Sequence, residues 1–309
     1  MTYLIREKYI KKKTPLIGGV ILIINLLLLI VLINFEYFKP ILQNYSFITF
    51  EDLKLYIIFA VPLFLIGLYD DKFDLNPNLK LFLLGIIIFL FLYFDNSSLI
   101  MDLNFSFFEK TIHTGKYSYL FTILCYLLFV NACNMFDGIN LQLILFSLFI
   151  FIIFILKGFF SIFFILLSIC LIFLGILNYR NKIFLGDGGS YLLSSIIGCT
   201  FIYQYKYFDN FFYGDEVFII LLIPSIDMLR LFIVRSINKK NPFKGDLNHF
   251  HHIVSNGLKN DKYTICVTTL MFILPSLLLF FLKIETYYIF IISIIVYTSL
   301  ILFLKKNIR

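Results

Sequence analysis

Apolar runs separated by short polar segments occupy almost the whole chain. The runs are about 16–20 residues long, and a helix needs roughly 17–25 apolar residues to cross the hydrocarbon of a bilayer. The pattern therefore predicts an all-α polytopic integral membrane protein with about ten transmembrane helices, forming a single domain over residues 1–309. The predicted helices cover residues 16–35, 53–69, 79–94, 118–133, 140–156, 159–177, 190–206, 216–234, 264–282 and 286–304.

The composition supports a membrane protein. Hydrophobic residues make up 61% of the 309 residues, charged residues make up only 15%, and the mean hydropathy is +0.93. These values exclude an ordinary soluble domain. The five cysteines lie in or near apolar runs without a C-x-x-C pair, which indicates buried hydrophobic side chains rather than disulfides or metal ligands.

Lysine and arginine positions indicate how the helices are oriented. If the N-terminus is cytoplasmic, 19 of the 26 Lys and Arg residues fall in cytoplasmic segments and seven fall outside, as the positive-inside rule requires. The net charge of +7 is then a feature of the cytoplasmic face, where it favours anionic lipid head groups and phosphate substrates. A nucleic-acid partner is not expected, because no basic face with interleaved aromatic side chains stands free of the membrane.

Four polar clusters lie at or beside the ends of apolar runs, all on the predicted cytoplasmic side. A carboxylate in the middle of a membrane helix costs roughly 2.5–3.5 kcal/mol on insertion scales. Acids gathered at one membrane edge therefore indicate a site for a metal and a diphosphate. The clusters cover residues 68–71, 134–138, 184–190 and 248–252.

Asp70 and Asp71 are adjacent acids, which repel each other unless a cation or a shared proton relieves them. The alternative is a solvated loop in which Asp71 or Asp74 caps the next helix.

Asn131, Asn134 and Asp137 recur every three residues, so a helix would place them along one stripe where they could contact a base or a sugar. The alternative is a satisfied helix end with an Asx turn.

The glycine-rich segment 186–190 opens a predicted helix. Its backbone N–H groups could approach phosphate oxygens, and Asp187 could hold Mg²⁺ against them. Asp187 could equally be only a helix N-cap, because the turn lacks the Lys-Ser/Thr of a P-loop.

Three of the four histidines fall within residues 249–252, in a basic loop after an apolar helix that carries Asp227 and Arg230. Imidazole N–H groups suit phosphate binding, whereas a zinc site would need a fourth ligand that is not evident nearby. For Asp227 and Arg230, a self-neutralising ion pair is the alternative to a functional role.

In order along the chain, these segments resemble the polyprenyl-phosphate N-acetylhexosamine-1-phosphate transferases, glycosyltransferase family 4. Five ordered matches on one membrane face make the resemblance specific. The matches are Thr14–Gly19 to T-P-x-x-G-G; Asp70, Asp71, Leu75, Pro77 and Lys80 to the D-D-x-x-x-L-x-P segment; Asn131, Asn134, Asp137 and Gly138 to N-x-x-N-x-x-D-G; Lys182–Ser190 to K-I-F-x-G-D-x-G-S; and Pro224, Asp227, Arg230, Arg235, Pro242, Phe243 and Asp246 leading into the H-x-H-H of His249, His251 and His252.

The resemblance implies that a lipid phosphate attacks the β-phosphorus of a UDP-linked amino sugar and that UMP leaves. A phosphate monoester is largely dianionic at neutral pH, so the site must mainly position the groups and neutralise charge. Mg²⁺ is the implied cofactor, with Mn²⁺ as an alternative; Asp187 is the leading metal ligand and Asp71 the second. Catalytic roles are implied for Asp70, Asp71, Asp187, His249, His251 and His252, and substrate contacts for Lys13, Lys80, Asn131, Asn134, Asp137, Arg230 and Arg235.

The H-x-H-H form resembles the lipopolysaccharide and teichoic-acid branch more than the peptidoglycan branch, whose triplet is H-H-H. We therefore expect the first step of polysaccharide or O-antigen assembly, in the bacterial inner membrane with the site facing the cytoplasm. The phospho-MurNAc-pentapeptide transferase of the peptidoglycan branch is one alternative. A transporter or flippase for an anionic solute is another, although it would need polar groups near the bilayer midplane. The expected partners are polyprenyl phosphate, a UDP-N-acetylhexosamine of unspecified sugar and the membrane; a homodimer is left open.

Overall fold

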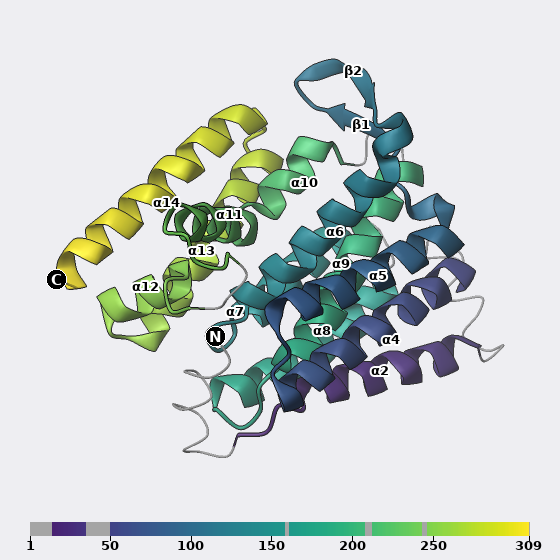
Figure 1. Cartoon of the computed structure of the whole chain (residues 1–309), viewed down its shortest axis with the longest axis horizontal. Coiled ribbons are helices and arrows are strands. Elements are labelled where there is room, and N and C mark those ends of the chain that lie inside the picture. Colours follow the sequence, from purple (N-terminus) through teal and green to yellow (C-terminus); the bar gives the residue numbers. More distant parts are fainter. Residues whose placement is uncertain (1–13, 35–49, 158–160, 208–211, 243–245, 309) are drawn as a thin grey trace. The chain divides into compact units, whose positions relative to one another are not determined.

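The computed structural model describes residues 14–34, 50–157, 161–207, 212–242 and 246–308, which are almost entirely helical (Figure 1). The all-α prediction is therefore confirmed. The helices are α2 (Gly18–Asn34), α4 (Phe50–Phe73), α5 (Pro77–Phe94), α6 (Ser118–Phe136), α7 (Gln142–Leu156), α8 (Ser161–Tyr179), α9 (Gly186–Tyr207), α10 (Gly214–Ile220), α11 (Leu222–Ile237), α12 (Phe250–Leu258), α13 (Asp261–Phe280) and α14 (Thr286–Ile308).

A short antiparallel hairpin, β1 (Asp102–Phe105) and β2 (Phe108–His113), lies between α5 and α6 and is flanked by the 3-10 turns Asn96–Ser98 and Gly115–Tyr117. The sequence pattern does not predict it, because strands of four and six residues are too short to give a clear alternation.

In the part of the chain that the structure describes, five helices are long and apolar enough to cross a membrane, or six if the bent pair α10–α11 is one span. This supports a multi-pass membrane protein, but the predicted number of ten spans is not confirmed. Helices α2 and α7 contain shorter apolar stretches, of 15 residues each in Gly18–Leu32 and Gln142–Leu156.

Two boundaries differ from the prediction. The expected continuous helix 216–234 is broken into α10 and α11, which meet at 79°. Pro224 explains the break, because it has no N–H to donate to the carbonyl of Ile220. The expected loop between residues 234 and 264 contains α12, whose Phe250, Ile253 and Val254 are buried at helical spacing.

The chain divides into two compact units, and helices α5 and α9 contribute residues to both. Unit 1 contains Ile88–Gln142 and Gly198–Arg309, and unit 2 contains Thr2–Ile87 and Leu143–Ile197. The expectation of one domain over residues 1–309 stays a prediction.

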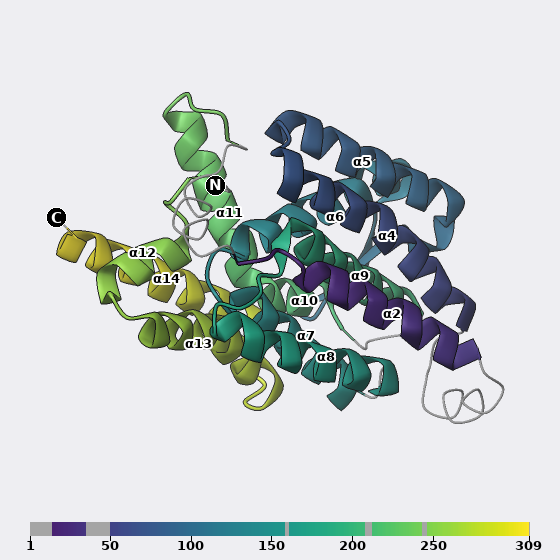
Figure 2. The same ribbon diagram turned by 90° about the horizontal axis from the view of Figure 1, so that it is seen from below.

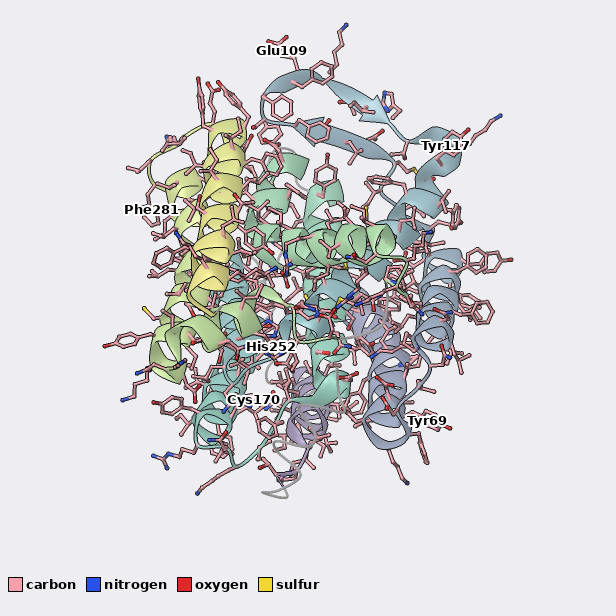
Figure 3. The ribbon with its side chains drawn as sticks, turned by 60° about the vertical axis from the view of Figure 1, so that its left-hand side comes forward. Tyr69, Glu109, Tyr117, Cys170, His252 and Phe281 are labelled. Atoms are coloured by element: carbon pink, nitrogen blue, oxygen red, sulfur yellow. The ribbon has the colours of Figure 1, made fainter. Side chains whose placement is uncertain are left out.

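In unit 1, α11 packs against α6, and α12 packs against α13 and α14. Ile219, Leu222, Leu279 and Ile289 form a buried apolar core between α10, α11, α13 and α14. The hairpin is fastened to this core by Asp215, which accepts hydrogen bonds from Ser106 and Thr286. Glu109 projects from the hairpin at one end of the unit, whereas His252 lies toward the other end (Figure 3).

In unit 2, α2 runs beside α4 and α8 (Figure 2). The backbones of α4 and α9 also approach closely, because a Cβ on Gly67 of α4 would lie 2.4 Å from the backbone nitrogen of Gly188 in α9. The extended chain before α2 also pairs with the chain before α9, since Phe184 donates to the carbonyl of Pro15 and Gly18 donates to the carbonyl of Phe184. The T-P-x-x-G-G and K-I-F-x-G-D segments are thus backbone-paired neighbours.

Candidate functional site

Unit 2 gathers three of the predicted acids around one lysine, and we call Asp70, Asp71, Lys80 and Asp187 the carboxylate cluster. The ammonium of Lys80 lies 2.5 Å from Oδ2 of Asp70 and 2.7 Å from Oδ2 of Asp187. The other carboxylate oxygen of Asp70 accepts a hydrogen bond from the backbone of Leu75 at 2.7 Å. Lys80 therefore bridges α4 and α9 by pairing with two of the three carboxylates.

Asp71 caps the N-terminus of α9. Its Oδ1 accepts from the backbone N–H of Asp187 at 3.1 Å, and its Oδ2 accepts from that of Gly188 at 3.4 Å. A carboxylate at this position stabilises the free N–H groups and the positive end of the helix. In this structure the glycine-rich turn thus presents these two N–H groups to Asp71.

Burial and mutual repulsion dominate the electrostatics of this cluster. Asp70 and Asp71 lie in the last turn of α4, beyond its predicted spanning part at residues 53–69. Burial raises the pKa of Asp71 to about 7, and the negative charge of Asp187 adds to the rise. Burial likewise raises the pKa of Asp70 to about 6, with Lys80 opposing the shift.

The described part of the chain contains no group of three His, Cys, Asp or Glu side chains arranged to hold a metal ion. The donor chemistry of the carboxylate cluster nevertheless fits a hard divalent cation. Aspartate oxygens are the ligands that Mg²⁺ takes in proteins, usually one or two of them together with substrate phosphates. Such a cation would also reduce the repulsion between Asp187 and Asp71 that helps to raise the pKa of Asp71.

Unit 1 gathers the predicted histidines around Asp227, and we call His249, His251 and His252 the histidine cluster. The rings of His249 and His251 are stacked, with centroids 5.6 Å apart and planes 13° apart, and the rings of His251 and His252 are 4.2 Å apart. Three imidazoles from one short segment therefore converge.

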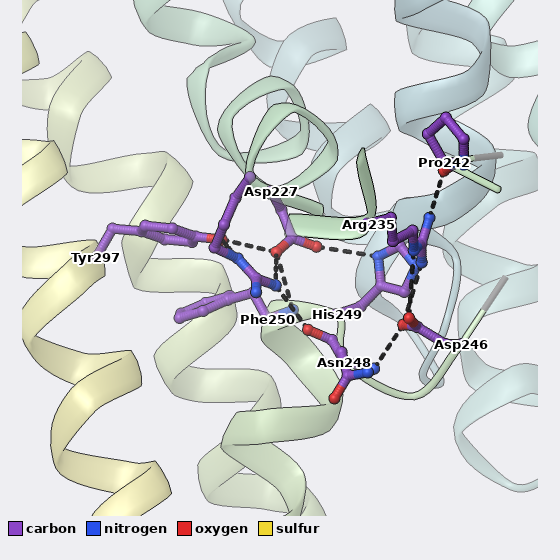
Figure 4. A network of polar contacts seen from close by, with 9 residues as sticks. Asp227, Arg235, Pro242, Asp246, Asn248, His249, Phe250 and Tyr297 are labelled. Carbon is purple, nitrogen blue, oxygen red and sulfur yellow. Dashed lines mark hydrogen bonds and ion pairs between the residues drawn. The ribbon is translucent and has the colours of Figure 1, made fainter. Parts of the chain in front are cut away.

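Asp227 of α11 is the centre of a buried network (Figure 4). Its Oδ2 lies 3.0 Å from Nδ1 of His249, and its Oδ1 accepts from the backbone N–H of Phe250 at 3.1 Å. Arg230, one helical turn later, donates to the same Oδ1 at 2.7 Å. The ion-pair interpretation of Asp227 and Arg230 is confirmed, but the pair also holds the start of α12 and the ring of His249.

The N-x-x-N-x-x-D-G segment meets the histidine cluster at Gly138. A Cβ on Gly138 would lie only 1.8 Å from Nε2 of His251, so the ring occupies the space that any side chain would need. Helix α6 ends at Phe136, and Asp137 is its C-cap, directly before this contact. Two motifs more than 100 positions apart thus come together in unit 1.

Several nitrogens of the histidine cluster are left without a partner. Among the described residues, nothing hydrogen bonds to Nε2 of His249 or to either ring nitrogen of His251, and all three atoms are buried. Burial, followed by the charges of His252 and His249, lowers the pKa of His251 well below 6.5, so this ring is neutral at pH 7. Unpaired buried polar atoms cost free energy, so they indicate a polar ligand.

The other residues that the sequence predicts to contact the substrate differ in their surroundings. Asn131 donates to the carbonyl of Leu127 in its own helix at 2.8 Å, while Asn134 and Asp137 are half-buried near the end of α6. Arg235 is buried and fastens the following loop, through Asp246 at 3.1 Å and the carbonyl of Pro242 at 2.8 Å. Their roles in substrate binding stay predictions, and Lys13 lies outside the described residues.

Tyr297 of α14 is not predicted from the sequence, although its hydroxyl contacts both Asp227 and Arg230. No sequence signal separates this tyrosine from the others in an apolar helix. Asp227 is also not among the residues predicted for the site, although an acid in an apolar helix is itself a signal of function.

Comparisons with known proteins give a consistent result. The sequence model of glycosyl transferase family 4 matches residues 53–205. The chain is similar to undecaprenyl-phosphate alpha-N-acetylglucosaminyl 1-phosphate transferases: that of Thermotoga maritima is 29% identical over 239 residues, which are 75% of this chain and 72% of the relative. The relatives from Salmonella typhi and Escherichia coli strain K12 are 25% and 24% identical, over 71% and 72% of this chain. The matched part spans 62% and 64% of the length of those two relatives.

Proposed function

We propose that the chain, whose residues 53–205 match the sequence model of glycosyl transferase family 4, transfers N-acetylglucosamine 1-phosphate from UDP-N-acetylglucosamine to undecaprenyl phosphate. An oxygen of the lipid phosphate attacks the β-phosphorus of the nucleotide sugar. The bond between that phosphorus and the bridging oxygen breaks, and UMP leaves. The activity for which the relatives are named supports the sugar and the lipid, and the H-x-H-H of His249–His252 supports the lipopolysaccharide and teichoic-acid branch.

The observation that carries this proposal is the histidine cluster, where buried ring nitrogens lie without a partner among the described residues beside Gly138. A diphosphate has many acceptor oxygens and suits imidazole N–H donors. His249 already uses Nδ1 toward Asp227, so its Nε2 is the atom that faces a ligand. Phosphoryl transfer needs chiefly positioned donors and charge neutralisation, which such a cluster supplies.

We assign the carboxylate cluster to charge balance and metal binding. Asp187 and Asp70 hold the ammonium of Lys80 in place, and Asp71 fixes the N-terminus of α9, so Asp187 starts a rigid helix. Asp187 is the residue that we propose to hold Mg²⁺, with Asp71 as the second candidate. When bound, the ion would neutralise negative charge on phosphate oxygens.

We further propose that the protein lies in the bacterial cytoplasmic membrane with the histidine and carboxylate clusters on the cytoplasmic side. The excess of Lys and Arg in the segments on that side supports the orientation. The transfer would then initiate assembly of a cell-surface polysaccharide such as O-antigen.

The test uses the purified full chain in detergent or in nanodiscs. Radiolabelled UDP-N-acetylglucosamine and undecaprenyl phosphate should give a labelled lipid diphosphate and UMP, and added UMP should reverse the reaction. Asp187→Asn should abolish transfer without lowering the melting temperature strongly. Asp74→Asn is a matched control, since Asp74 is exposed and its φ of 55° is one that Asn tolerates.

A panel of UDP-sugars with the same acceptor tests the sugar. If label is transferred only from a different UDP-N-acetylhexosamine, the proposed sugar is wrong but the proposed reaction is supported. Absence of any Mg²⁺-dependent transfer or UMP exchange would refute the proposal. Full activity of Asp187→Asn would show that Asp187 has no essential role in the reaction.

A further inference from the structure

Tyr297 of α14 is a buried tyrosine at the centre of a polar network. Its side chain is only 1% exposed. The hydroxyl donates to Oδ1 of Asp227 at 2.7 Å and accepts from Nε of Arg230 at 2.8 Å. Its ring packs on Phe250, with centroids 5.0 Å apart. One hydroxyl therefore contacts both members of the ion pair in α11, and its ring contacts the first residue of α12.

The donors of Asp227 divide unevenly between its two oxygens. Oδ1 receives Tyr297, Arg230 and the backbone N–H of Phe250, whereas Oδ2 contacts His249. Three donors on one oxygen fix the plane of the carboxylate. As a result Oδ2 points toward the histidine cluster, as Figure 4 shows for His249.

The fixed carboxylate determines what His249 can offer a ligand. An ionised carboxylate only accepts hydrogen bonds, so Nδ1 of His249 carries the proton in this contact. Its Nε2 is buried and has no hydrogen-bond partner among the described residues. The ring is also stacked on His251, so a rotation of His249 would disturb the rest of the histidine cluster.

We propose that Tyr297 is a positioning residue for the transfer reaction. Its hydroxyl holds Asp227 and Arg230 in the arrangement that orients His249, so that Nε2 of His249 faces the diphosphate of the substrate. This inference rests on the proposed function, because it assigns the diphosphate as the ligand of the histidine cluster. The alternative is that the hydroxyl only donates a hydrogen bond to a buried carboxylate and so contributes to stability.

Tyr297→Phe tests the inference, because it removes the hydroxyl and keeps the ring on Phe250. Tyr126→Phe is the matched control: Tyr126 is 2% exposed in the same unit, and its hydroxyl donates to Sγ of Cys199 at 2.9 Å. Hydrogen bonds to charged groups are the stronger ones, so Tyr297→Phe should lower kcat/KM by about tenfold to a hundredfold. Tyr126→Phe should change kcat/KM by less than about threefold.

Two readouts separate positioning from stability. In a His249→Gln background, Tyr297→Phe should cause no further loss, because the pathway through His249 is already absent. Ring nitrogen-15 spectra should show a defined Nδ1–H tautomer for His249 in the parent chain and a mixture of tautomers in Tyr297→Phe. Equal losses in Tyr297→Phe and Tyr126→Phe, a full independent loss in the His249→Gln background, or an unchanged tautomer would overturn the inference.

The spectra also distinguish failure of the inference from failure of the proposed function. A chain without transfer activity would refute the function, while the tautomer of His249 in Tyr297→Phe would still report whether Tyr297 orients the ring. An active chain with an unchanged tautomer would refute only the role of Tyr297.

Discussion

The imidazole of His251 occupies the space directly over the Cα of Gly138, where an added Cβ would lie 1.8 Å from Nε2 of the ring. This close contact joins the end of α6 to the histidine cluster. It also explains why the residue after Asp137 has to be glycine, since even one methyl group would displace the ring.

Gly138→Ala should therefore move His251 and lower transfer activity. A displacement of about 1 Å in a positioned group can cost a hundredfold in rate, so we expect a loss of that order at nearly unchanged expression. Gly85→Ala is the matched control, because a Cβ on Gly85 meets nothing within 4 Å. This control should be neutral, or stabilising by roughly 0.5–1 kcal/mol as for other helical Gly→Ala changes. Wild-type turnover by Gly138→Ala would contradict the tight contact.

Lys80→Met should destabilise the protein, because it leaves Asp70 and Asp187 without their shared ammonium. Breaking a buried ion pair from one side typically costs about 3–5 kcal/mol, which melting of the purified variant in detergent would detect. The exposed Lys72→Met is the control and should melt like the wild type. Adding Asp187→Asn to Lys80→Met should restore part of the stability by removing one charge, without restoring transfer. A double variant less stable than Lys80→Met would rule out this charge balance.

Asp71→Asn and Asp187→Asn should separate a helix cap from a metal ligand. We expect chelation to stop transfer and Mg²⁺ to restore it, with Mn²⁺ as a weaker substitute. Asp187→Asn should raise the Mg²⁺ concentration that is needed for activity, which can be measured from any residual UMP exchange. Asp71→Asn should instead leave the Mg²⁺ requirement and the free energy of unfolding nearly unchanged, because Asn caps a helix about as well as Asp, whereas Asp71→Ala should lower the free energy of unfolding by roughly 0.5–2 kcal/mol. A raised Mg²⁺ requirement in Asp71→Asn would make it a metal ligand as well.

His251 should make the protein less stable on acidification, against the opposite contribution of Asp70 and Asp71, whose raised pKa values of about 6 and 7 let the folded chain take up protons that the unfolded chain does not. The pKa of this ring is lowered by burial and by the neighbouring His252 and His249, while Asp227 opposes the shift. Below a pKa of about 6.5 the unfolded chain binds a proton that folded His251 does not bind, so acid favours unfolding. One such group contributes up to about 1.4 kcal/mol per pH unit.

The measurement is the free energy of unfolding between pH 7 and pH 5. His251→Gln should remove the contribution of this ring, so that acidification destabilises the variant less than it destabilises the wild type, by up to about one proton in the slope. His113→Gln is the control, because His113 is exposed on the hairpin beside Asp102 and contacts none of the histidine cluster. An identical slope in the His251→Gln variant and the wild type would refute the assignment.

Much of the architecture could be predicted from hydrophobic patterning. Long apolar runs dictate helices, because a membrane leaves no other way to satisfy backbone groups in an open chain. The hairpin between α5 and α6 could not be predicted in the same way, because it depends on contacts made after folding, such as the hydrogen bonds that Asp215 accepts from Ser106 and Thr286. The break between α10 and α11 follows from Pro224, a local signal that hydrophobic patterning does not register.

The sequence alone determined the membrane class, the family resemblance and most residues of the two clusters, because polar groups in an apolar chain are costly and stand out. Only the tertiary structure decided their partners. It showed that Asp71 caps α9, that Lys80 bridges Asp70 and Asp187, and that Asp227 holds His249. It also found Tyr297, whose position in an apolar helix looks like ordinary packing in the sequence. The reason is physical. The free-energy cost of placing a polar group in an apolar segment follows from the residue and its neighbours in the sequence, whereas the partners that offset this cost come from residues far away in the sequence.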